Sequence, residues 1–372
     1  MSRPATPTAG EPIETKELSS VNSAKATAHR VQRAFWTAVR LSIAGALLFY
    51  LAKSGIIDEH AVVRSFTAWP IAIAAIVLIV FDTLLMAIRL AILFRPLGLH
   101  LTVPQSMKLT LVGIFFRTFL PGVAGGDAVK FFYAAKGLVG RRVDIVTIVL
   151  FDRAIGMFSL LIMPLLFAPF LPRSIWESRV IEDVLAACAI VSGCMLLGFV
   201  LCISFAGQMD RMARWILRST RIAPLPGQMI RAVGMFGRHL DRVGEALGLS
   251  LVANASLVVV MILAVVALNP NGLDWKMSLL IPVGFIANSL PITPGGLGVG
   301  EAAFDQLFKM TGLHGGGGAL LCWRIWFTLV SLSGLWFYVR GVGRSVRDVR
   351  AGDAESQTEE PEVKDAIGSI RG

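Results

Sequence analysis

Two short stretches rich in proline and glycine interrupt long apolar segments, and they constrain the fold more than any other feature of the sequence. The first runs from Leu120 to Asp127 and the second from Leu290 to Glu301. Each contains Leu-Pro, three further residues and then Gly-Gly, and an acidic residue follows. Proline removes a backbone donor and clashes with the preceding helical turn, so neither stretch fits inside a continuous helix. Irregular backbone inside a membrane is tolerated only where it is buried in protein or lines a water-filled cavity.

The composition indicates an all-α polytopic membrane protein. Of the 372 residues, 55% are hydrophobic and only 16% are charged, and the mean hydropathy is +0.69, values typical of several membrane-spanning helices. The net charge of +10 fits cytoplasmic loops and contacts to anionic lipid headgroups. A nucleic-acid partner is excluded, because no basic patch is interleaved with aromatic residues outside the apolar segments.

About eight membrane segments are expected, six of them full spans. The predicted spans are residues 35–51, 69–94, 143–170, 184–205, 249–268 and 319–339. The interrupted segments, 109–132 and 277–313, have arms of about 12 residues, or roughly 18 Å of helix, too short for a hydrocarbon core of about 30 Å. Each is therefore either a re-entrant hairpin or a pair of half-helices that cross together. Gly315 to Gly318 are expected to form a flexible loop before the last span.

Charge favours hairpins for both interrupted segments. With two hairpins, both termini and the most basic loops fall on one side, which the positive-inside rule assigns to the cytoplasm. A full crossing by the first segment would instead place Lys136, Arg141 and Arg142 outside. With hairpins the two halves of the chain have opposite orientation, so the sequence predicts an inverted repeat of the kind found in transporters.

Three regions flank or interrupt the transmembrane domain, which we place at residues 35–345. Residues 1–34 are predicted to be a disordered basic cytoplasmic tail, and residues 346–372 a disordered C-terminal tail. Residues 206–246 show basic amphipathic helical patterns. Such helices lie on a membrane surface and contact anionic headgroups, although a helix pair packed on the protein's own loops is an alternative.

The ends of the two interruptions have the features of phosphate sites. A helix that starts at Gly125-Gly126, or at Gly295-Gly296, presents unpaired backbone N–H groups and the positive end of its dipole. Helix starts of this kind bind phosphate. Asp127 and Glu301 fall in the first turns, where each is either a helix cap or a carrier of a proton, a cation or an amine headgroup.

Charged residues inside the predicted spans complete the candidate site. Arg117 lies before the first break, and Arg153 and Arg324 lie on the spans that follow the two breaks. Arginine suits bidentate phosphate binding. The alternative is that Arg153 and Arg324 form structural ion pairs with Asp127 or Glu301.

Three further charged residues, Asp82, Arg89 and Asp152, also lie inside predicted spans. Asp152 directly precedes Arg153, so the two side chains point to different faces of their helix. Asp82 and Arg89 are seven residues apart on one helix face and are expected to pair with each other or to snorkel.

No enzyme, metal or cofactor site is predicted. The sequence lacks a Walker motif, HExxH and GxSxG, and the five histidines fall in predicted tails and loops. The four cysteines, Cys188, Cys194, Cys202 and Cys322, lie on predicted helices without a CxxC spacing. They are expected to be small core residues.

Both interruptions resemble the signatures of one family. Phe116–Lys130 and Pro294–Ala303 are similar to motifs of the lysylphosphatidylglycerol synthase transmembrane region, although the family often has Arg where this chain has Gly300. The resemblance covers residues 35–345 and implies a flippase-like domain of the inner membrane. In the bifunctional synthases this domain moves aminoacylated phosphatidylglycerol outward, and a soluble domain that uses aminoacyl-tRNA follows it. We expect no such catalytic domain here.

The features together favour a lipid translocase. Its substrate would be a phospholipid, an aminoacylated phospholipid, or a polyprenyl or glycolipid, and its partners would be membrane lipids. One alternative is the membrane subunit of an aminoacyl-phosphatidylglycerol synthase system whose catalytic domain is a separate chain, which would make a lipid-modifying enzyme a partner. Another is a non-transporting scaffold for envelope biogenesis.

Overall fold

The computed structural model divides the chain into two compact units, Met1–Tyr50 and Leu51–Gly372. The structure describes residues 67–119, 124–137, 141–173, 176, 178–204, 234, 236–289, 296 and 298–340, all of which belong to the second unit. The predicted first span, both predicted tails, residues 120–123 and 290–295, and most of the 206–246 region lie outside the described residues. The described part is all-helical, as predicted.

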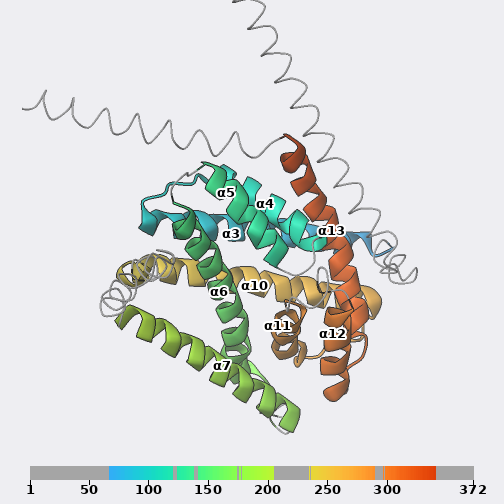
Figure 1. Cartoon of the computed structure of the whole chain (residues 1–372). Coiled ribbons are helices and arrows are strands. Elements are labelled where there is room, and N and C mark those ends of the chain that lie inside the picture. Colours follow the sequence, from blue (N-terminus) through green and yellow to red (C-terminus); the bar gives the residue numbers. More distant parts are fainter. Residues whose placement is uncertain are drawn as a thin grey trace, which may run out of the picture. The chain divides into compact units, whose positions relative to one another are not determined.

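Eleven helical elements follow one another in the described part of the chain (Figure 1). They are α3 (Trp69–Phe94), η1 (Arg95–Leu97), α4 (Val103–Phe119), α5 (Ala124–Gly137), α6 (Arg142–Phe167), η2 (Ala168–Phe170), α7 (Arg179–Ser204), α10 (Leu240–Leu268), α11 (Met277–Asn288), α12 (Val299–Met310) and α13 (Gly316–Arg340). Five stretches, based on α3, α6, α7, α10 and α13, are long and apolar enough to cross a membrane. They confirm five of the six predicted spans.

The interrupted segments form two pairs of short helices. The 17 residues of α4 and the 14 of α5 flank the first interruption, and the 12-residue helices α11 and α12 flank the second. Within each pair the two helices pack against each other. The predicted breaks are therefore present, and each break is followed by a new helix start.

Two predicted boundaries are wrong. The sequence analysis assigned residues 240–246 to the surface amphipathic region, but α10 begins at Leu240 and continues without interruption to Leu268. The predicted loop at Gly315–Gly318 is largely the first turn of α13. Gly316 lies so close to the backbone of Phe304 that a Cβ atom there would clash with it, and the Gly317 N–H donates to the Asp305 carboxylate at 2.7 Å. Small residues at these positions let α13 start against α12.

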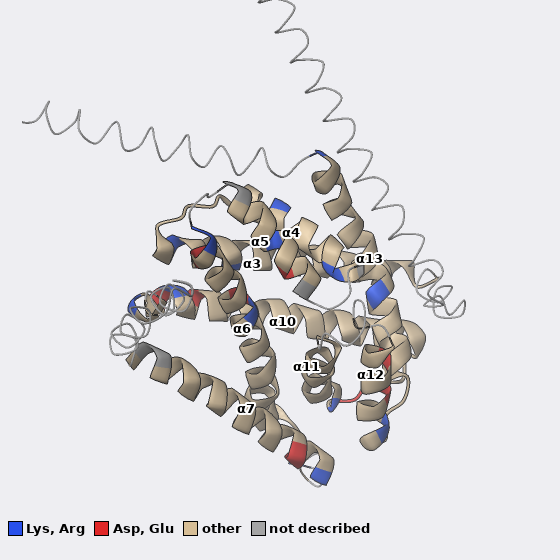
Figure 2. Cartoon of the chain, viewed as in Figure 1, with Lys and Arg blue, Asp and Glu red and all other residues tan. Residues whose placement is uncertain are grey.

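The core forms where these helices meet. Helix α3 packs along α10, and α13 packs against α4, α10 and α12. Small buried residues such as Ala75 and Ala264 allow close helix approach of the kind found in membrane proteins. In contrast, α7 packs on α6 and is uncharged along most of its length, with Arg179 and Glu182 at one end (Figure 2). Its apolar outer face suits contact with lipid.

Candidate functional site

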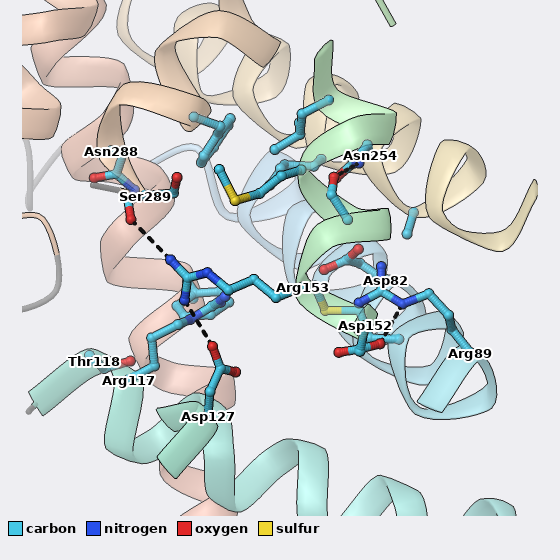
Figure 3. Close-up of a pocket in the computed structure, with 18 of the residues that line it drawn as sticks. Asp82, Arg89, Arg117, Thr118, Asp127, Asp152, Arg153, Asn254, Asn288 and Ser289 are labelled. Atoms are coloured by element: carbon cyan, nitrogen blue, oxygen red, sulfur yellow. Dashed lines mark hydrogen bonds and ion pairs between the residues drawn. The ribbon is translucent and has the colours of Figure 1, made fainter. Parts of the chain in front are cut away.

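A cavity of about 180 Å³ lies among the membrane helices, and residues of α3, α4, α5, α6, α10, α11 and α13 line it (Figure 3). Its charged lining residues are Asp82, Arg89, Arg117, Asp127, Lys130, Asp152, Arg153 and Arg324. Aromatic and aliphatic side chains, including Leu257, Phe285 and Phe327, form the rest of its wall. Ionisable residues among membrane-spanning helices are costly and usually mark a functional path.

The first ion pair joins the helix after the first break to α6. The Arg153 guanidinium donates to Asp127 Oδ2 at 2.8 Å and to the Ser289 carbonyl oxygen, at the end of α11, at 3.4 Å. Both charged side chains are about one quarter exposed, 26% for Arg153 and 24% for Asp127. Arg153 therefore contacts both broken segments from one position.

The second ion pair occupies the corresponding place beside the second break. Arg324 Nε donates to Glu301 Oε1 at 2.9 Å, and its NH2 group donates to Asn288 Oδ1 at 3.1 Å. Glu301 also accepts the backbone N–H of Gly298 at 2.8 Å, which caps the start of α12. Of the alternatives drawn from the sequence, the structure thus shows Glu301 as both a cap and an ion-pair partner.

The third ion pair corrects a prediction. Arg89 pairs with Asp152 at 2.7 Å and donates to the Ser250 hydroxyl at 2.8 Å, so the expected pairing of Arg89 with Asp82 is wrong. Arg89 reaches across to α6 because Gly156 leaves room there; a Cβ at Gly156 would lie 3.2 Å from the guanidinium. Asp152 and its neighbour Arg153 point to different partners, as predicted.

Arg117 is held by an aromatic ring, not by a carboxylate. Its guanidinium lies over Phe327, 5.3 Å from the ring centroid, and Phe327 stacks on Trp323 at 4.8 Å. Among the described residues, Arg117 makes no ion pair and no hydrogen bond through its side chain. The charges of Asp127, Asp82 and Arg153 also act on it. A cation–π contact leaves the N–H donors of the guanidinium free for a ligand.

The predicted glycines serve close packing. Gly126 lies against the carbonyl of Gly113, and a Cβ there would come within 2.7 Å of Arg117 Cβ. Gly296 has φ of +74°, and a Cβ would come within 2.6 Å of Asn288 Oδ1, so a side chain at either position would force α4 or α11 to move. Gly125 is the second residue of α5, which begins at Ala124. The predicted helix start at Gly295-Gly296 is wrong, because α12 begins at Val299 with Gly298 as its N-cap; Gly295 itself lies outside the described residues.

Some lining residues were missed by the sequence analysis. Lys130 follows Asp127 by three residues, which places both on one helix face, and its stem packs across Gly113. Asn288 ends α11 just before the second break and binds Arg324. Position relative to the breaks could have identified both residues. No cluster of His, Cys, Asp or Glu suited to a metal ion is found among the described residues.

The family comparison agrees with the motifs at the breaks. A family model described as the lysylphosphatidylglycerol synthase TM region matches residues 36–341, close to the range inferred from the resemblance. No curated protein and no solved structure matches the chain. Because the matched range includes most of the chain and all five long apolar helices, this multi-pass membrane protein belongs to the lysylphosphatidylglycerol synthase TM region family.

Proposed function

We propose that this protein is a lipid translocase of the inner membrane, with both termini in the cytoplasm. Its substrate class is a lipid with a phosphate-bearing headgroup, such as a phospholipid, an aminoacylated phospholipid or a polyprenyl-phosphate lipid. The observation that carries the proposal is Arg117, a guanidinium without a carboxylate partner among the described residues, in a cavity enclosed by membrane helices.

The charge around Arg117 favours an anion. Arg117 and Arg153 act on each other electrostatically, and the one carboxylate bonded to this pair of arginines, Asp127, is bound to Arg153. Arg117 therefore keeps a positive charge that no bonded carboxylate neutralises, in a medium that screens it poorly. A phosphate would accept hydrogen bonds from the planar fork of Arg117.

The size of the cavity fits a headgroup and not a whole lipid. A volume of about 180 Å³ is below the roughly 300–1,000 Å³ of pockets that enclose drug-sized ligands. The acyl chains would therefore remain in the bilayer while the headgroup enters. The apolar side chains in the wall, Leu257, Phe285 and Phe327 among them, can contact the first carbons of such chains.

Paired features support an inverted repeat of two re-entrant hairpins. The arms α4 and α5 pack together, as do α11 and α12. Each break is followed by an acid and then by the arginine that binds it, 26 residues later for Asp127 and 23 residues later for Glu301. Repeats of opposite orientation around a midplane site provide alternating access in known transporters.

Two further parts of the proposal concern partners and chemistry. We assign the protein no catalytic step of its own, so a lipid-modifying enzyme, where one acts with it, would be a separate chain. The basic region at residues 206–239 would contact anionic headgroups on the cytoplasmic surface.

Purified protein in proteoliposomes tests the proposal. Fluorescent phosphatidylglycerol in the inner leaflet is followed as it becomes accessible to an impermeant quencher, and a fluorescent glycolipid without phosphate serves as the comparison. We expect the wild type to move the phospholipid faster than protein-free vesicles do. Arg117→Gln should slow this movement about tenfold, the loss of roughly 1.4 kcal/mol of binding, because no other described guanidinium in the cavity is free of a carboxylate.

Arg340→Gln is the matched control. Arg340 also lies over an aromatic ring, Trp336 at 3.7 Å, but it does not line the cavity. It should therefore retain wild-type transport. The proposal is overturned if the wild type moves no phospholipid faster than empty vesicles, or if Arg117→Gln is as active as Arg340→Gln.

A further inference from the structure

One carboxylate in the cavity differs from the others. Asp127, Asp152 and Glu301 are each bonded to an arginine. Asp82 on α3 is 9% exposed and lines the cavity, yet it makes no hydrogen bond or ion pair with any described residue. A buried carboxylate without a bonded cation is costly when ionised.

The surroundings of Asp82 determine what can compensate its charge. Helix α4 contributes Arg117 and α3 itself contributes Arg89, and the positive charges of both act on Asp82. Of the other helices packed on α3, α6 presents Asp152 and Arg153 to the cavity, α13 presents Arg324, and α10 presents the uncharged Asn254. Each of these charged groups except Arg117 belongs to one of the three ion pairs; they are Arg89, Asp152, Arg153 and Arg324.

Arg117 is therefore the one cation among these groups that has no bonded acid. Its charge can interact either with Asp82 or with a bound phosphate. In the empty cavity it stabilises the ionised form of Asp82 across the cavity. A phosphate bound to Arg117 would neutralise that cation and would add a negative charge near Asp82. Both changes favour the neutral form of the carboxyl group.

We propose that Asp82 is a proton site that couples proton uptake to the binding of the anionic headgroup at Arg117. This inference rests on the proposed function. One proton from the aqueous phase binds a carboxylate oxygen of Asp82 when the headgroup enters, giving the carboxylic acid. The proton leaves to water when the headgroup leaves, so proton and lipid anion cross together.

Charge balance in the cavity explains why such coupling is favourable. In the empty state the Arg117 cation and the Asp82 anion sum to zero, and in the loaded state Arg117, the lipid anion and neutral Asp82 also sum to zero. The three ion pairs are neutral in both states, and partly exposed Lys130 is unchanged. In neither state do Arg117, Asp82 and the lipid anion together carry a net charge through the low-dielectric part of the membrane.

A pH gradient across proteoliposomes tests the coupling. For co-transport of one proton with each lipid anion, a gradient of about one pH unit should enrich phosphatidylglycerol about tenfold in the leaflet on the alkaline side. A trapped pH-sensitive dye should record proton movement with the lipid. Asp82→Asn, which keeps the size of the side chain, should still equilibrate the lipid but without enrichment and without a dye signal. Asp144→Asn, outside the cavity, should behave as the wild type.

A second measurement is independent of transport. Glycerol phosphate is titrated into detergent-solubilised protein in buffers of different ionisation enthalpy, which counts the protons taken up with the ligand. We expect close to one proton more in the wild type than in Asp82→Asn. Transport by the wild type without enrichment and an equal proton count in both proteins would overturn the coupling and leave the proposed function intact.

Other outcomes are also decisive. Asp82→Asn could selectively weaken the binding of lipids with an amine headgroup while the proton count stays the same as in the wild type. Asp82 would then bind the amine, and the coupling would be refuted. If the wild type neither moves phosphatidylglycerol nor binds glycerol phosphate, the proposed function fails first, and the coupling fails with it.

Discussion

The ion pair between Arg89 and Asp152 should contribute more to stability than any other charge contact in the cavity. Its two side chains are 6% and 7% exposed, against 8% and 23% for Arg324 and Glu301. Asp152→Asn would leave the Arg89 guanidinium buried without a counter-charge, with the Ser250 hydroxyl and a neutral amide oxygen as acceptors. Breaking a buried pair costs about 3–5 kcal/mol, and the Ser250 contact places the expected loss near 3 kcal/mol, a factor of about 150 in the unfolding equilibrium.

Asp82→Asn provides the sharpest comparison for this prediction. Both acids line the cavity near Arg89 and are nearly inaccessible to water, but Asp82 has no bonded partner among the described residues. Its replacement should therefore change the free energy of unfolding by less than about 1 kcal/mol. Asp144→Asn, which removes a surface pair with Arg141, should cost about 0–1 kcal/mol.

The measurement is unfolding by a denaturing detergent in mixed micelles, followed by circular dichroism. A double-mutant cycle with Arg89→Gln isolates the pair from other effects of each substitution. The double variant should recover much of the stability lost by Asp152→Asn, because no charge is then left unpaired. Equal losses in Asp82→Asn and Asp152→Asn would refute the assignment of Asp152 as the partner of Arg89.

Three further predictions follow from the packing and the topology. Arg324→Gln should lower stability by about 3 kcal/mol, and adding Glu301→Gln should restore part of it in the same unfolding assay; no recovery would contradict a structural ion pair. Gly334→Ala should reduce the yield of folded protein, because its Cβ would clash with the Leu111 carbonyl, whereas Gly193→Ala, with open space, should have little effect in size-exclusion chromatography. Arg141→Cys, in a background without native cysteines, should react with an impermeant thiol reagent only from the cytoplasmic side; labelling on intact cells would exclude the hairpin at α4 and α5.

The elements that depend on local sequence were predictable. Long apolar runs located α3, α6, α7, α10 and α13, and Gly-Pro chemistry located the breaks before α5 and α12. One error arose at the start of α10, where no proline separates the amphipathic pattern from the apolar span, and the helix continues through both. The other arose where a tertiary contact determines the local structure. Gly316 looks like a loop residue until its contact with Phe304 on α12 is known.

The candidate site was predictable in its residues but not in its partners. Each buried charge was visible as an ionisable residue in an apolar span, so Arg153, Arg324 and Asp82 could be found from the sequence. The partner of Arg89 could not, because it depends on how α3, α6 and α10 cross and on the space left by Gly156. The free guanidinium of Arg117 depends on its position over Phe327, which no spacing along the chain indicates.

The ring beneath Arg117 has a consequence for the speed of turnover. An aromatic face orients a cation without cancelling its charge, so the guanidinium is ready for an anion without first breaking a salt bridge. Because the same site has no second free arginine among the described residues, an anion is held by one fork and not by a cage. Rapid passage requires binding strong enough for entry and weak enough for exit. In the proposed translocase, a single guanidinium over Phe327 would give short residence times, which suit the release of each lipid before the next one binds.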